Sequence, residues 1–65
     1  MFDKNLLKAE LVYNNYTFEK LAKSLDLTKG TISKKMNGSS EWTLSEIQKI
    51  GEIVGKKKLI SIFFE

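Results

Sequence analysis

The chain has 65 residues, with 11 basic and eight acidic side chains and a formal net charge of +3. It contains no cysteine or histidine, which excludes a disulfide framework and the usual zinc sites, and no acids are spaced as a carboxylate metal site. A chain of this length forms one domain and has no room for a deep catalytic cleft. We therefore expect a single domain, residues 1–65, without a metal or cofactor.

No side chain pattern in the sequence indicates catalysis or export. No nucleophile lies beside a base, and no glycine-rich loop is placed to hold a phosphate. The first residues lack the basic and apolar regions of a signal peptide, and no apolar run approaches the length of a membrane span. We expect a cytoplasmic protein that is not an enzyme.

Four helix starts share one pattern, in which an apolar residue precedes a capping Asp or Thr and a second apolar residue follows the cap by four positions. These groups are Phe2-Asp3 with Leu7, Tyr16-Thr17 with Leu21, Leu27-Thr28 with Ile32, and Trp42-Thr43 with Ile47. At the fourth start, Glu46 completes a capping box with Thr43. The pattern predicts an all-α fold of four to five short helices.

Apolar residues recur at helical spacing after each predicted start, so each helix lends one apolar stripe to a shared core. The predicted helices end near Asn14-Asn15, at Leu25, near Asn37 and at Val54 before Gly55. The expected inward residues are Leu7, Leu11 and Val12; Phe18, Leu21, Ala22 and Leu25; Ile32 and Met36; and Leu44, Ile47, Ile50 and Val54. Trp42 is expected to pack on Ile47, and Tyr13 and Tyr16 to be half-buried.

The C-terminal segment, residues 56–65, is ambiguous because a short apolar run suits a helix or a strand. We favour an additional helical turn or two that packs Leu59 or Ile60 and Phe63 on the core. The segment could also serve as a dimer contact. The dimerisation candidates are Leu59, Ile60, Ile62, Phe63 and Phe64.

Residues 17–37 have the spacing of a helix-turn-helix, because only Asp26 and Leu27 separate the second predicted helix from the cap Thr28. Ala22 is small enough to let the next helix approach closely. Asp26 lies where the turn requires a positive φ, which Asp tolerates better than most residues.

Lysines 29, 34 and 35 lie in a stretch, residues 27–40, that contains no acid. With Ile32 and Met36 turned to the core, a helix from Lys29 would expose Gly30, Thr31, Lys34 and Asn37. Lys35 would lie at the edge of the core face, with its stem packed and its ammonium reaching outward. Such an acid-free face indicates an anionic partner.

The stretch TFEKLAKSLDLTKGTISKKMNG resembles the helix-turn-helix of lambda-repressor-like and Cro-like phage regulators of Gram-positive bacteria, and SSEWTLSEIQKIGEIVG resembles their fourth helix. The resemblance covers nearly the whole chain. It departs from the family at Phe18, where many members have a glutamine that contacts a phosphate, and at Asp26, where many have glycine. At the position of Lys35, many members bury an apolar residue.

The resemblance implies a lambda-repressor-like bundle that presents the helix from Lys29 to the major groove of double-stranded DNA. The expected base-reading residues are Lys29, Gly30, Thr31, Ser33 and Lys34, with Gly30 permitting close backbone approach. The expected phosphate contacts are Thr17, Lys23, Thr28, Lys35, Asn37, Gly38 and Ser39, through side chains or main-chain N–H groups.

One short recognition helix makes few base contacts, so such a protein is expected to bind a palindromic operator as a homodimer. The expected function is transcription regulation, of the Cro repressor type. The alternative is a protein-interaction adaptor or antirepressor-like module on the same scaffold, since fold alone does not determine function. Steep salt dependence of binding would distinguish DNA binding from an apolar adaptor.

Overall fold

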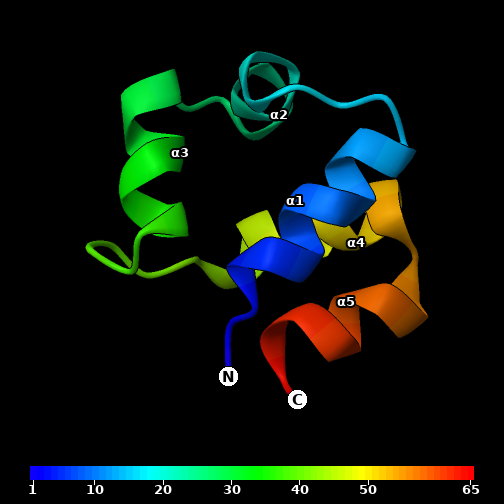
Figure 1. Ribbon diagram of the computed structural model, residues 1–65. Coiled ribbons are helices and arrows are strands. Elements are labelled where there is room, and N and C mark those ends of the chain that lie inside the picture. The colour runs from blue at the N-terminus through cyan, green and yellow to red at the C-terminus, as the bar shows by residue number, and fades with distance from the viewer.

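The computed structural model describes residues 1–65, which form five helices and no strand (Figure 1). The helices are α1 (Lys4–Tyr13), α2 (Phe18–Leu25), α3 (Lys29–Met36), α4 (Leu44–Val54) and α5 (Lys56–Phe63). The predicted all-α class is therefore confirmed, and the C-terminal segment is a helix and not a strand. None of these helices is both long enough and apolar enough to span a membrane.

Side chains cap the first four helices at the predicted residues. Asp3, Thr17, Thr28 and Thr43 each accept a hydrogen bond from the backbone N–H three residues later. Each such cap stabilises its helix by about 1 kcal/mol. Helix α5 begins differently, at Gly55 with φ 92° and without a side-chain cap, so its position depends on packing.

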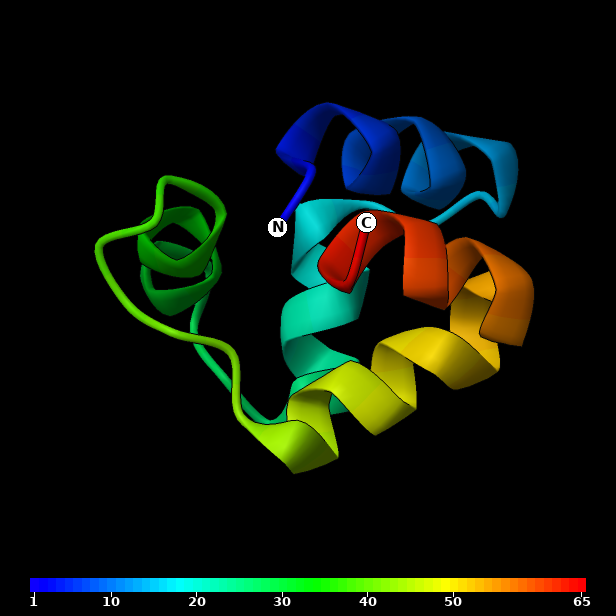
Figure 2. The ribbon, with the colours of Figure 1, turned by 90° about the horizontal axis from the view of Figure 1, so that it is seen from below.

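The core lies where α1, α2 and α4 meet, and α3 and α5 each add apolar side chains to it (Figures 1 and 2). Its buried members are Leu7, Leu11, Leu21, Ala22, Leu25, Ile32, Met36, Ile50 and Ile62. Two predicted core residues are wrong, because Val12 is 75% exposed and Leu44 is 70% exposed. Val12 follows the buried Leu11 and is turned about 100° away from it on the helix, whereas Leu44 is the first residue of α4 and precedes its buried stripe.

The two ends of the chain meet beside the start of α4. The Asp3 N–H donates to the Ile62 carbonyl over 2.7 Å, and the Phe2 ring lies 5.3 Å from Phe63 and 5.8 Å from Trp42. Trp42 and Phe63 complete an edge-to-face contact at 5.9 Å. No pattern in the sequence indicates this three-ring cluster, which closes α5 onto the bundle.

Two aromatic side chains carry details that sequence patterns did not predict. The indole N–H of Trp42 is buried without a hydrogen-bond acceptor, which costs stability. Tyr13 is 81% exposed and not half-buried as expected, since it is the last residue of α1. Tyr16 is half-buried, in agreement with the prediction.

Candidate nucleic-acid interface

The turn between α2 and α3 has the predicted left-handed residue. Asp26 adopts φ 59° and ψ 42°, and the N–H of Leu27 then bonds to the Ala22 carbonyl over 2.8 Å. Ala22 is buried, so its methyl group adds little bulk between the two helices. The short turn therefore holds α3 across the end of α2, as in a helix-turn-helix.

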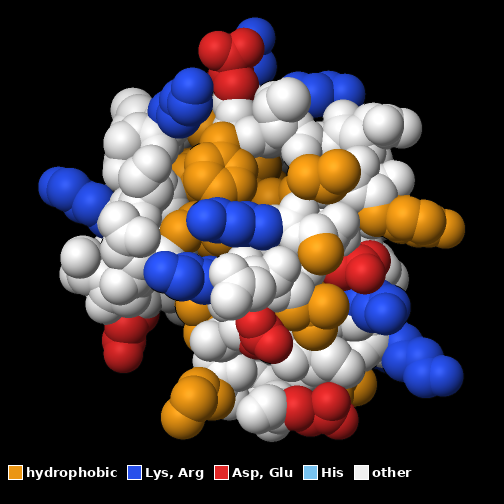
Figure 3. Space-filling model, in the orientation of Figure 1, with side chains coloured by type: hydrophobic (Ala, Val, Ile, Leu, Met, Phe, Trp, Pro, Cys, Tyr) orange, Lys and Arg blue, Asp and Glu red, His pale blue; other side chains and the backbone are white.

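Helix α3 has an inward and an outward side. Ile32 and Met36 are buried, which confirms the predicted core face, whereas Lys29, Gly30, Ser33 and Lys34 are exposed. In Figure 2, α3 stands at one edge of the molecule, and in Figure 3 the surface over it consists mainly of lysine atoms and of backbone and other atoms that are neither acidic nor hydrophobic side chains. The exposed side chains of α3 include no acid, so this side can approach a polyanion without repulsion from its own residues.

The first turn of α3 is held by two threonines. The Thr28 hydroxyl accepts from the Thr31 N–H over 3.2 Å and lies 2.9 Å from the Thr31 hydroxyl. Thr31 is half-buried and not exposed as expected. Gly30 beside it is open: a Cβ built there would have its nearest neighbour, Thr28 Oγ1, 4.0 Å away. Helix packing therefore does not require glycine at this position.

The loop after α3 exposes Asn37, Gly38 and Ser39. Their main-chain N–H groups, however, already donate to carbonyls of α3, at distances of 3.0, 3.3 and 2.9 Å. These main-chain N–H groups are therefore not free to bind phosphate, and the predicted contact by Gly38, which has no side-chain donor, is wrong. The side-chain amide of Asn37 and the hydroxyl of Ser39 remain as donors.

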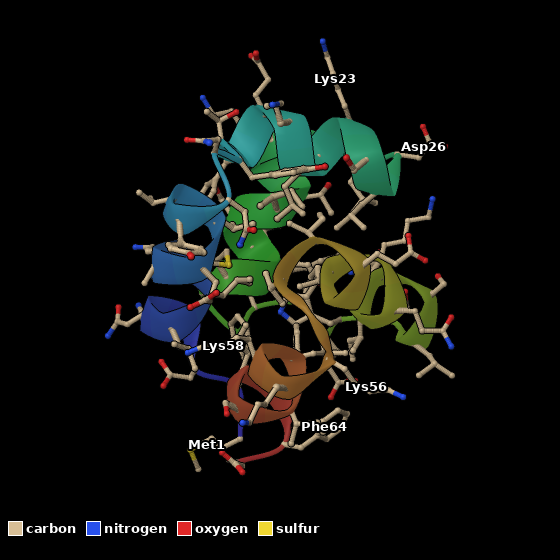
Figure 4. All side chains as sticks on the ribbon, turned by 90° about the vertical axis from the view of Figure 1, so that its right-hand side faces the viewer. Met1, Lys23, Asp26, Lys56, Lys58 and Phe64 are labelled. Atoms are coloured by element: carbon tan, nitrogen blue, oxygen red, sulfur yellow. The ribbon has the colours of Figure 1, made fainter.

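Helix α2 contributes the other expected phosphate contacts. Thr17 is exposed, and its hydroxyl caps the helix by accepting from the Lys20 N–H over 3.1 Å. Lys23 projects into solvent from the C-terminal half of α2, near Asp26 (Figure 4). Phe18 packs against the core, so it supplies apolar contact where many members of the resembling family have a polar glutamine.

The structure contradicts the prediction that the Lys35 ammonium reaches outward to a phosphate. Lys35 is only 6% exposed, and its ammonium lies 2.8 Å from Glu46 Oε1, 2.8 Å from the Glu41 carbonyl oxygen and 5.8 Å from the centre of the Trp42 ring. The stem packs as expected, but the charge points inward because Glu46 lies beneath it. Lys35 therefore does not offer a free charge to a phosphate, and we withdraw it from the candidate contacts.

Glu46 takes part both in the predicted capping box with Thr43 and in an ion pair with Lys35 that the sequence did not predict. Its carboxylate accepts from the Thr43 N–H over 2.8 Å, which confirms the capping box, and from Lys35. Burial raises the pKa of the Glu46 carboxyl, but the hydrogen bonds from Lys35 and Thr43 and the lysine charge together hold that pKa below its ordinary value. Spacing along the chain gives no signal for this pair, because its partners are 11 residues apart.

The dimerisation candidates fall into three groups in the structure. Ile62 is fully buried in the core and is thus not available as a dimer contact, because α5 packs on α1 with this side chain inward. Leu59 and Phe63 are half-buried. Only Ile60, 45% exposed, and Phe64, 64% exposed, present substantial apolar surface.

The lysine run at the start of α5 lies across the molecule from α3 (Figures 1 and 2). Lys58 is 3.7 Å from Glu10 of α1, and Lys56 projects from the opposite side of α5 (Figure 4). These charges are therefore remote from the outward side of α3 and do not extend that surface.

Together, the left-handed turn, the short helix α3 and its acid-free outward side are compatible with a DNA-binding helix-turn-helix. The model of one protein family, described as BetR domain, matches residues 4–60. The chain therefore belongs to the BetR domain family, a family of small helical, DNA-binding-like domains. No curated protein and no solved structure shows a significant match. Membership of the family suggests a DNA-binding regulatory role.

Proposed function

We propose that this protein is a sequence-specific DNA-binding transcription regulator, of the Cro-like repressor type, that inserts α3 into the major groove. The observation that carries the proposal is the outward side of α3, which is polar, lysine-bearing and free of acids. Duplex DNA carries about one negative charge per 1.7 Å of its axis, so an acid on this side would be repelled.

The residues proposed to contact bases and those proposed to contact phosphates are chosen by the exposure of their side chains to solvent. Lys29, Ser33 and Lys34 reach base edges, where lysine donates to guanine N7 and O6. Gly30 lets the backbone approach the groove, and the half-buried Thr31 braces the first turn while its methyl group faces a thymine methyl. The proposed phosphate contacts are the side chains of Thr17, Lys23, Thr28, Asn37 and Ser39.

We further propose that two copies bind a palindromic operator. The base-reading residues cover a single short helix, and two such helices about 34 Å apart would read two half-sites of B-DNA. Ile60 of α5 and Phe64, which directly follows α5, are the exposed apolar residues that would support self-association.

Selection of bound duplexes from a random pool tests the proposal directly. A palindromic consensus is expected, with affinity that falls as salt rises by about 0.9 logarithmic units per logarithmic unit of salt for each phosphate neutralised. Absence of any enriched sequence, together with salt-independent binding to a protein through α5, would instead support the adaptor function.

A further inference from the structure

A buried ion pair joins the inner side of α3 to the first turn of α4. We propose that Lys35 and Glu46 are positioning residues, which set the orientation of α3 and thereby the discrimination between DNA sequences. The inference rests on the proposed function, since it assigns a role in base selection to two residues that do not reach DNA themselves.

All three groups around the Lys35 ammonium come from one short segment of chain. The Glu41 carbonyl and the Trp42 ring belong to the end of the loop between α3 and α4, and the Glu46 carboxylate lies in the first turn of α4. The Trp42 ring in turn contacts Phe2 and Phe63. One side chain thus connects the recognition helix to the cluster that joins both ends of the chain.

Besides this ion pair, α3 is held at its N-terminal end by the short turn from α2 and along its inward side by apolar contacts. It comprises residues Lys29–Met36, and residues 37–43 connect it to α4 without regular structure (Figure 2). No other side chain of α3 forms a hydrogen bond or ion pair with another helix. Its other side-chain anchors are apolar, Ile32 and Met36, and such contacts tolerate small rotations better than hydrogen bonds do.

The energetics of buried pairs favour a role in geometry over one in stability. Desolvation of two charges offsets most of their attraction, so a well-packed apolar replacement is often as stable or more stable. The ammonium at this site nevertheless meets two oxygens at 2.8 Å, and both hydrogen bonds are directional. Their removal is therefore expected to loosen the position of α3 more than it lowers stability.

The double variant Lys35→Met/Glu46→Gln tests the proposal. Methionine keeps the volume of the lysine stem, and glutamine retains the capping box with Thr43. The net charge does not change. The matched control is Lys58→Met/Glu10→Gln, which removes the ion pair between α5 and α1 on the far side of the molecule.

Two measurements are required on each variant. The first is amide hydrogen exchange of α3 and of the loop to α4, which needs no DNA; the second is affinity for the selected operator and for a scrambled duplex at one salt concentration. In the double variant, we expect exchange to rise in α3 and the loop and not in α1. Operator affinity should fall about tenfold, equivalent to losing one good base contact, with affinity for scrambled DNA unchanged.

The outcomes separate this inference from the proposed function. Unchanged exchange in α3, or an equal loss of affinity for both duplexes, would overturn the positioning role even if the wild type selects an operator. If the wild type selects no operator, the proposed function fails and base selection through this pair fails with it; faster exchange in α3 would then support only the orienting role. The control should match the wild type in every measurement.

Discussion

Lys34 and Lys35 are neighbours in sequence but belong to two different regions of the molecule. Lys34 lies on the outward side of α3, exposed to solvent, whereas Lys35 is buried at the junction of α3 with α4, paired with Glu46. One residue step turns a side chain by about 100° on a helix. Counting charged residues in a sequence therefore overestimates the charge that a partner can reach. Residues 27–40 carry three lysines, but only two of them are exposed in the structure.

The largest effect on stability is expected from shortening a buried side chain on the inward side of α3. Ile32 is fully buried, so Ile32→Ala should lower the free energy of unfolding by about 2–5 kcal/mol through lost burial and a cavity. Urea denaturation measures this change. Ser33→Ala, on the outward side, is the control and should leave stability within about 0.5 kcal/mol of the wild type. Equal effects would abolish the distinction between the two sides.

Removing one partner at the junction should have the next largest effect. Lys35→Met leaves the Glu46 carboxylate buried with only the Thr43 N–H, and we expect a loss of about 3 kcal/mol in unfolding free energy. Adding Glu46→Gln should restore most of it. A destabilisation of the same size in Lys34→Met would show that the inward position of Lys35 is not what matters.

Removing Lys34 should sharpen the contrast, because its effect is expected on binding alone. Lys34→Ala should weaken operator binding by about 1–3 kcal/mol and relax preference at one base pair. Unfolding free energy should be unchanged. Titration against operators substituted at each position measures the change, and a uniform loss across all sequences would place Lys34 among the phosphate contacts.

At Gly30, one substitution is expected to raise the stability of the fold and to weaken DNA binding. Because a Cβ fits there and glycine disfavours helix, Gly30→Ala should raise unfolding free energy by up to about 1 kcal/mol. The added methyl group should at the same time weaken operator binding, since it holds the backbone away from the groove. Thermal denaturation and operator titration of the same sample test both expectations; tighter binding would argue against close backbone approach.

The smallest effect on stability is expected from lowering the pH, through protonation of the Glu46 carboxylate. The folded-state pKa of Glu46 is depressed, so its contribution to stability is fully present above the unfolded carboxyl pKa, about 4.3. That contribution is lost as pH falls below 4.3 and through the folded-state value. Glu46→Gln should flatten this part of the stability profile measured by urea denaturation, with Glu52→Gln as the control for a lost carboxylate on α4. If the stability of Glu46→Gln depends on pH as that of the wild type does, this part of the pH dependence does not come from Glu46.

Features that depend on near neighbours could be predicted from the amino-acid pattern alone. The four caps, the helix ends and the positive φ of Asp26 follow from contacts within four or five residues. Helical spacing likewise places Ile32 and Met36 on one inward side of α3. The same spacing misplaced Val12 and Leu44, because helical period alone does not tell where a core ends.

Contacts between distant groups could not be predicted in this way, because they depend on how the helices pack. The tertiary structure turned the Lys35 charge toward Glu46, buried Ile62 and joined Phe2, Trp42 and Phe63 into one cluster. These contacts connect residues 11 or more positions apart, and no periodic pattern encodes them. The physical reason is that a charge or a ring is stabilised by whatever the folded chain places beside it, and that neighbour is set by how the helices pack.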